Sequence, residues 1–324
     1  MGARIPERMK AVAIDRFGGP EVIQTESLPV PRPAADQVLI RLETAGIGAW
    51  DPEVREGELG DEDKTPFPRV IGNDGAGTVV AIGDRVTSLR VGDRVYGYSM
   101  LGGFYAEYVA VSEDNVAKVP PGVRLDEAGA LGADGVTAVR GLQDELRLVA
   151  GERLLVFGAS GGVGHIAVQL AKRIGARVLA IASGSDGVDL VRRLGADRAI
   201  DGHKGDPAKA AREFAPEGLD AALVLTAGQG LAGALAAVKP GGRVAYPNGV
   251  EPEPRIPEGV EARPYDGTPD ADAFSRLNQL IGKHPFHVEL GRTYRLEDAE
   301  AAHRDIDRHH LGKLAFRVNG EGNA

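Results

Sequence analysis

A glycine-rich turn between an apolar run and an amphipathic run carries the clearest chemistry in this sequence. Residues 158–164 read GASGGVG, after the apolar run LLVF and before a helical pattern that continues to about residue 174. In the core Ala159-x-Gly161-x-x-Gly164, Gly161 lets a phosphate approach the main chain, and Gly164 allows close packing of helix on strand. The positive end of the helix dipole then faces the phosphates. We expect a dinucleotide site at Ala159, Ser160, Gly161, Gly162, Val163 and Gly164.

The next apolar run lacks the acidic residue that usually binds the adenosine ribose of NAD. It ends in the sequence ASGS, so that a hydroxyl stands where a carboxylate is expected, and cationic side chains follow. This combination favours NADP(H), whose 2′-phosphate needs cations. NAD(H) remains an alternative because Asp186 is close. The candidate ligands of the 2′-phosphate are Ser183, Arg192, Arg193, His203 and Lys204.

These residues need a parallel sheet with crossover helices to position them. From residue 153 the chain alternates apolar strands, glycine turns and helical stretches, which is typical of a doubly wound α/β domain. Strands are predicted at 153–157, 177–182, 198–200, 220–225 and 243–246, with helices at 163–174 and 186–194. The Pro-rich stretch 251–270 is expected to be an irregular crossover with one short strand.

The first part of the chain has shorter segments of alternating polarity, which predict a β-rich domain. Its strands are expected at 9–14, 37–42, 77–82, 94–98 and 105–111. After the α/β part we expect a helix at 271–282, short strands at 286–296, a helix at 297–308 and a last strand at 313–318.

Composition limits the class of partner. The 324 residues are 43% hydrophobic, and 38 basic against 47 acidic residues give a net charge of −9. Such a charge disfavours nucleic acid and anionic lipid. The sequence has no apolar run of about 18 residues, and its start has no signal-peptide core, so we expect a cytoplasmic protein without membrane partners. It has no cysteine, which removes every zinc site that needs sulfur ligands.

In several stretches the chain resembles the zinc-free quinone oxidoreductase (zeta-crystallin-like) branch of the medium-chain dehydrogenase/reductase superfamily. The matching stretches are MKAVAIDRFGGPEV, GNDGAGTVVAIGDRVTSLRVGDRV, GGFYAEYVAV, GVTA, GASGGVG, PGGRV and GKLAFRV, in that order. The resemblance implies a GroES-like β-rich catalytic domain (residues 1–125, completed by 269–324) around a Rossmann domain (residues 126–268). It also implies a homodimer or homotetramer that pairs through the Rossmann sheet.

The zinc-using relatives of this branch have Gly-His-Glu where this chain has Gly72-Asn73-Asp74. Without that imidazole and without sulfur ligands we expect no metal. Hydride from NADP(H) must then go to an acceptor that is already electron-poor, such as a quinone or an α,β-unsaturated carbonyl compound. Two alternatives stay open: an enal or enone reductase without quinone activity, and a non-catalytic NADPH-binding sensor or structural protein.

The resemblance also indicates residues near the reacting groups. Trp50 either walls the acceptor site or is a core aromatic, and Asp51 either contacts the nicotinamide ribose side or caps its loop. Tyr98 and Tyr105 could donate a proton to the acceptor, or could simply fill the sheet. Relatives usually carry an asparagine where this chain has Gly48, and its absence motivates the non-catalytic alternative.

Two more candidates belong to the coenzyme side. Thr137 resembles a threonine that lies near the nicotinamide in similar enzymes, and Asn248 is expected at the carboxyl edge of the sheet. The lysine and tyrosine that similar enzymes present to the 2′-phosphate are replaced by Gly187 and Gly202. His165, early in the predicted nucleotide-binding helix, is expected on an exposed surface.

Overall fold

The computed structural model describes residues 4–58 and 66–319, which form two compact units. The first contains the residues up to 133 together with 269–275 and those from 290 onward. The second contains 134–268 and 276–289. The chain therefore passes between the units at 133/134, 268/269, 275/276 and 289/290. The predicted boundaries are 125/126 and 268/269, and the second unit also contains residues 276–289 of the predicted return segment.

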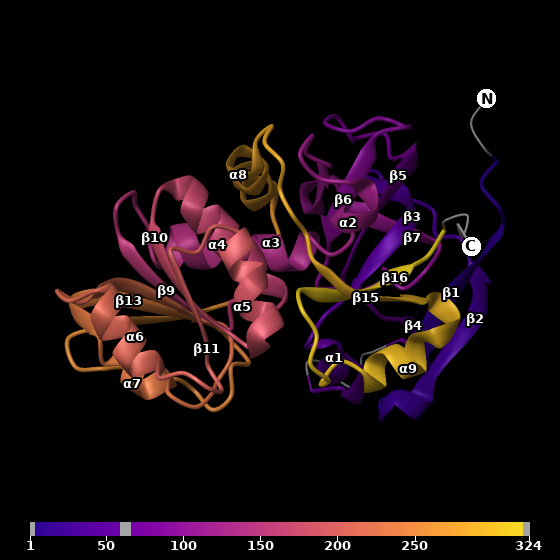
Figure 1. Cartoon of the computed structure of the whole chain (residues 1–324). Coiled ribbons are helices and arrows are strands. Elements are labelled where there is room, and N and C mark those ends of the chain that lie inside the picture. The colour runs from indigo at the N-terminus through magenta and orange to yellow at the C-terminus, as the bar shows by residue number, and fades with distance from the viewer. Residues whose placement is uncertain (1–3, 59–65, 320–324) are drawn as a thin grey trace. The chain divides into compact units, whose positions relative to one another are not determined.

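The first unit is built on two sheets (Figure 1). A three-stranded sheet has the order β2-β1-β4, and a seven-stranded sheet has the order β15-β16-β3-β5-β6-β8, with β7 paired to β3. Its strands are β1 (Arg8–Ile14), β2 (Ile23–Pro29), β3 (Gln37–Ile47), β4 (Arg69–Val70), β5 (Asp74–Ile82), β6 (Arg94–Tyr98), β7 (Tyr108–Ser112), β8 (Val116–Lys118), β15 (Leu290–Arg295) and β16 (Lys313–Arg317). Its helices are α1 (Asp51–Glu56), α2 (Leu125–Ala128) and α9 (Ala299–Arg304). Strands from both chain ends thus share one sheet.

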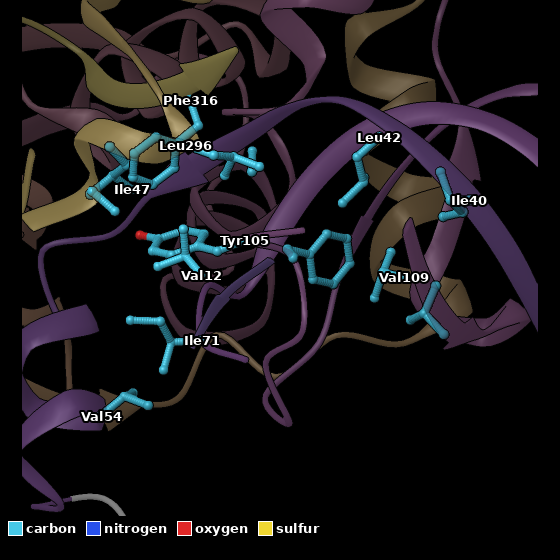
Figure 2. Close-up of a cluster of buried hydrophobic side chains, with 14 of the residues drawn as sticks. Val12, Ile40, Leu42, Ile47, Val54, Ile71, Tyr105, Val109, Leu296 and Phe316 are labelled. Carbon is cyan, nitrogen blue, oxygen red and sulfur yellow. The ribbon is translucent and has the colours of Figure 1, made fainter. Parts of the chain in front are cut away.

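The core of this unit draws on segments far apart in the sequence. Figure 2 shows Tyr105 among apolar side chains that include Val12, Ile71 and Phe316. The rings of Tyr105 and Phe316 meet edge to face, with centroids 4.7 Å apart. The alternation of strand residues explains this core, because every second side chain points to the same face.

The second unit is a six-stranded parallel sheet in the order β11-β10-β9-β12-β13-β14. Its strands are β9 (Arg153–Phe157), β10 (Arg177–Ala182), β11 (Arg198–Asp201), β12 (Leu219–Val224), β13 (Val238–Pro247) and β14 (Glu261–Tyr265). The connecting helices are α4 (Gly162–Ile174), α5 (Gly184–Arg193), α6 (Pro207–Phe214) and α7 (Leu231–Leu235). The strand order reverses between β9 and β12. With the right-handed crossovers that are usual in such sheets, this reversal puts α4 and α5 on one face and α6 and α7 on the other.

Two helices contain two of the four divisions between the units. These are α3 (Gly132–Val139), which continues as a π-helix over Arg140–Glu145, and α8 (Ala271–Ile281).

The predicted fold class, a doubly wound Rossmann sheet with a GroES-like β-rich part, is confirmed. Three predicted elements differ. The strand expected at 105–111 begins only at Tyr108, because Tyr105 and Ala106 bond to β1 instead: Val12 N donates to Tyr105 O at 2.7 Å, and Ala106 forms an isolated bridge with Ala11. The helix expected at 297–308 is α-helical only over α9, and the strands expected at 286–296 are the single strand β15. Among the described residues, no helix has the length and hydropathy that a membrane span requires.

Candidate functional site

The fingerprint turn connects β9 to α4 as the sequence predicts. Gly158 has φ +88°, a conformation that glycine adopts at little cost. The N–H groups of Gly158 and Ala159 donate to Ile181 O of the neighbouring strand at 3.1 and 2.9 Å, which fixes the turn at the carboxyl edge of the sheet. The N-cap of α4 is Gly161, and no side chain caps this end of the helix. The first-turn N–H groups of a 13-residue helix are therefore oriented as an anion site requires.

The two outer glycines of this helix start differ in what a side chain would meet. A Cβ on Gly164 would lie 2.2 Å from Gly158 O, so glycine is required for the helix to pack on the turn. A Cβ on Gly161 would meet nothing closer than Gly158 O at 3.6 Å. The space beside Gly161 thus fits the approach of a diphosphate. At Gly162 a Cβ would lie 2.3 Å from Oδ2 of Asp134, a carboxylate that the sequence analysis did not include.

His165 is fully buried, and the expectation of an exposed position was wrong. Its Nδ1 lies 2.9 Å from Gly161 O, and its Nε2 accepts from Glu289 N at 3.0 Å. Accepting at Nε2 requires the proton on Nδ1, so the ring is neutral and donates to Gly161. Burial lowers the pKa of His165 to about 4, in keeping with that role. The side chain of His165 thus connects the start of α4 to the backbone at Glu289 and stabilises the turn from the buried side.

The end of β10 brings together part of the predicted 2′-phosphate set. Ser183 N donates to Ser160 Oγ at 3.1 Å, and Ser183 Oγ lies 3.1 Å from His203 Nε2. Lys204 is exposed and directly follows His203. Asp201 supports this corner, because its Oδ1 accepts from the backbone N–H of His203 at 3.0 Å. β10 and β11 are parallel neighbours, so both strand ends supply the same edge.

The structure separates the two arginines from this corner. Arg192 and Arg193 are exposed in the last turn of α5, whereas Ser183 is its N-cap. At about 1.5 Å per residue, roughly 13 Å of helix lies between Ser183 and Arg192. Arg192 also pairs with Asp189 at 3.6 Å. Their predicted role at the phosphate is not supported by this placement.

The structure gives a steric reason for glycine at the two positions where similar enzymes have lysine and tyrosine. A Cβ on Gly187 would lie 2.9 Å from both Cβ and Oγ of Ser160. Glycine at this position allows α5 to pack directly on the fingerprint turn. A Cβ on Gly202 would similarly lie 2.9 Å from Cγ2 of Ile181.

Thr137 and Asn248, far apart in sequence, contact the same short segment, which begins with the last residue of β14. Asn248 Nδ2 donates to Asp266 Oδ1 at 2.9 Å, and Tyr265 Oη donates to Thr137 O at 3.0 Å. A Cβ on Gly267 would lie 2.1 Å from Thr137 Oγ1. Residues 265–267 therefore link both candidates, although the Pro-rich stretch offered no sequence signal for this.

In the first unit, two of the predicted catalytic residues, Asp51 and Tyr105, form a buried network, and the other two, Trp50 and Tyr98, form a ring pair. Asp51 Oδ2 accepts from Gly48 N at 2.7 Å and from the hydroxyl of Tyr105. Asp51 and Tyr105 are 1% and 0% exposed. The ring of Trp50, the N-cap of α1, meets Tyr98 edge to face at 6.3 Å.

The ionisation of this network favours a structural role. Burial raises the pKa of Asp51 to about 6, although the bonds from Tyr105 and Gly48 act in the opposite direction. Burial and the adjacent Asp51 carboxylate raise the pKa of Tyr105 well above its ordinary value. The Tyr105 proton is engaged by Asp51, and its ring is in the core. Its placement favours a positioning residue over the proton donor that the sequence suggested.

A second buried network occupies the place where zinc-using relatives have Gly-His-Glu. Asp74 Oδ2 accepts from Lys313 Nζ at 2.8 Å and from Ala133 N at 3.0 Å, and both charged side chains are nearly inaccessible. Asn73 Nδ2 donates to Ser99 O at 2.7 Å. These side chains are thus engaged by protein groups. Lys313, from the last strand, was not singled out because a lysine near a chain end has no distinctive spacing.

Comparison with known proteins agrees with this architecture. Residues 34–121 match the family described as "Alcohol dehydrogenase GroES-like domain", and residues 162–256 match "Zinc-binding dehydrogenase". The quinone oxidoreductase of Mus musculus is 32% identical over 313 residues, covering 92% of this chain and 94% of the mouse protein.

Two further similar proteins are named for other substrates or another coenzyme. The NADPH-dependent alkenal/one oxidoreductase of Arabidopsis thaliana, a chloroplastic protein, is 38% identical over 210 residues, covering 61% of this chain and 54% of its own length. A crystal structure described as an NAD-dependent alcohol dehydrogenase superimposes with a TM-score of 0.86 at 30% identity, covering 96% of this chain and all of the other.

Proposed function

We propose that this chain reduces quinones or α,β-unsaturated carbonyl compounds with NADPH. The chain belongs to the quinone oxidoreductase branch of the medium-chain dehydrogenase/reductase superfamily and is an oxidoreductase. NADPH binding is supported mainly by one observation: no side chain caps the start of α4, and a Cβ on Gly161 would meet nothing closer than 3.6 Å. When bound, NADPH supplies a hydride from its nicotinamide ring. The protein supplies binding, orientation and shelter from water.

Each part of the second unit has a task in this proposal. The first-turn N–H groups of α4 bind the diphosphate, and Gly161 leaves the space for it. Thr137 and Asn248, linked through residues 265–267, orient the nicotinamide end. His165 holds the turn in place from the core side.

The preference for NADPH rests on the corner after β10. Ser183 provides a hydroxyl, and His203 and Lys204 provide donors that suit a 2′-phosphate. Asp186 Oδ1 accepts from the backbone N–H of Gly187 at 2.9 Å, so part of its hydrogen-bonding capacity is used locally.

The acceptor half is assigned to the first unit. Trp50 offers aromatic surface to a planar electrophile, and the buried Tyr98 packs against its ring edge to face. Asp51 with Tyr105 fixes the loop from which Trp50 projects. A second candidate, an enone reductase without quinone activity, is favoured by the Arabidopsis relative named for alkenals and enones.

The coenzyme preference is tested with matched variants. Removing the charge in Lys204→Ala should raise the Kd for NADPH about tenfold or more, as expected for one charge-assisted hydrogen bond, and leave the Kd for NADH unchanged. Arg192→Ala, at the far end of α5, should change neither. Equal affinity of the unmodified protein for both coenzymes would refute the preference.

The acceptor class is tested by steady-state rates on paired quinones and enones. Turnover of both supports the main proposal, and turnover of enones alone supports the second candidate. Binding of NADPH without oxidation by any acceptor would identify a non-catalytic binder instead.

A further inference from the structure

A short loop of the first unit, Ser99–Gly103, presents two large apolar side chains to solvent. Met100 is 46% exposed and Leu101 is 87% exposed. One exposed apolar side chain is common on protein surfaces and needs no explanation. This loop differs because several hydrogen bonds fix its backbone while these two side chains stay exposed.

Backbone and buried groups brace the loop at several points. Ser99 N donates to Asn73 O at 2.8 Å, and the buried Asn73 returns a bond from Nδ2 to Ser99 O at 2.7 Å. Leu101 N donates to Ser99 Oγ at 3.1 Å, and Gly103 N donates to Val70 O at 3.1 Å. A loop held in this way loses little conformational entropy when its side chains contact a ligand.

The loop is linked through the buried Tyr98 to Trp50, the aromatic residue assigned to the acceptor. Tyr98 Oη donates to Met100 Sδ at 2.8 Å, and the Tyr98 ring meets the Trp50 ring. The whole stretch from Val95 to Ala106 contains no charged residue. The loop and the residues that flank it therefore offer a ligand no ionised side chain of their own.

We propose that Trp50, Met100 and Leu101, here called the apolar rim, bind a hydrocarbon substituent of the electrophile. The inference rests on the proposed function and narrows its substrate class: quinones or enones with an alkyl or aryl tail are preferred over unsubstituted or anionic ones. Each methylene that the rim buries should tighten binding up to about fourfold.

The experiment uses para-benzoquinones with alkyl chains of increasing length. Their Kd is measured by quenching of Trp50, the single tryptophan, with correction for absorbance. For the unmodified protein the Kd should fall with chain length. Leu101→Ser, and more strongly Met100→Ser combined with it, should flatten that dependence while the melting temperature stays the same. Val91→Ser is the matched control, because Val91 is a 59% exposed residue of the same unit.

The outcomes separate the two proposals. A dependence on chain length that persists in the double variant, or that is absent from the unmodified protein, overturns the assignment of the rim. Sedimentation showing that Leu101→Ser dissociates an oligomer would assign the rim to a second copy of the chain and likewise overturn it. Turnover is measured separately, so quinones that bind with the expected dependence but are never reduced contradict only the proposed function.

Discussion

Of the four residues first considered for catalysis, Asp51, Tyr98 and Tyr105 are buried, and Trp50 alone is partly exposed. Trp50 is partly exposed and packs against the core, so its ring is available to a ligand. Asp51 and Tyr105 are buried and bonded to each other, so they act through the loop that they hold. The choice between catalytic and positioning roles depended on burial, which residue type does not specify.

Asp51 should make stability fall as the pH rises from about 4 to about 6. In that range the folded state keeps the proton, because the pKa is raised from 3.8 to about 6, while the unfolded chain has already lost it. The stability lost by pH 8 is about 3 kcal/mol. In Asp51→Asn this contribution disappears, so the melting temperature of the variant relative to the unmodified protein should be higher at pH 8 than at pH 4.5. A difference that does not change with pH would contradict the raised pKa.

The pair of Asp74 and Lys313 should be far more important for stability than a surface pair. Lys313→Met leaves a buried carboxylate without its cation, which costs about 3–5 kcal/mol. Lys10→Met is the control, because the partly exposed pair of Lys10 with Glu297 is expected to contribute at most about 1 kcal/mol. Thermal unfolding of both variants measures the contrast, and equal effects would show that the buried pair has no special role.

At the scale of elements, the turn between β9 and α4 combines a packing requirement with the proposed binding of the diphosphate. Gly164 faces the turn itself, whereas Gly161 faces open space. A sequence pattern treats both as fingerprint glycines, but the structure gives them different neighbours.

Substitution of these two glycines should therefore have opposite consequences. Gly164→Ala should destabilise the fold, because its Cβ would collide with the backbone at Gly158. Gly161→Ala should keep the melting temperature of the coenzyme-free protein, since its φ of −80° suits alanine, but should weaken NADPH binding at least tenfold. Calorimetric titration with NADPH and thermal unfolding distinguish the two effects. Unchanged NADPH affinity in Gly161→Ala would place the diphosphate elsewhere.

At the scale of the whole molecule, the expected homodimer or homotetramer requires a surface for pairing. Among the described residues, β14 is an edge strand of the Rossmann sheet, where a second chain can add its own edge. Its exposed Ala262 contributes only a small side chain to that edge.

Sedimentation equilibrium should give at least twice the mass of one chain. Ala262→Asp should shift the distribution toward single chains, because a charge at the paired edge must be desolvated, whereas Ala262→Thr should not. A single-chain mass for the unmodified protein would refute the expected pairing, and insensitivity to Ala262→Asp would point to another surface.

The sequence by itself determined the Rossmann sheet, the position of the glycine-rich turn between β9 and α4, and the family. Those features depend on local periodicity and on fixed spacings, which each segment carries without its neighbours. Only the tertiary structure decided that His165 is buried, that Arg192 and Arg193 lie away from Ser183, and that Lys313 meets Asp74. Burial, helix length and long-range ion pairs arise when segments far apart in the chain are brought together, and no local pattern encodes which side chains will then meet.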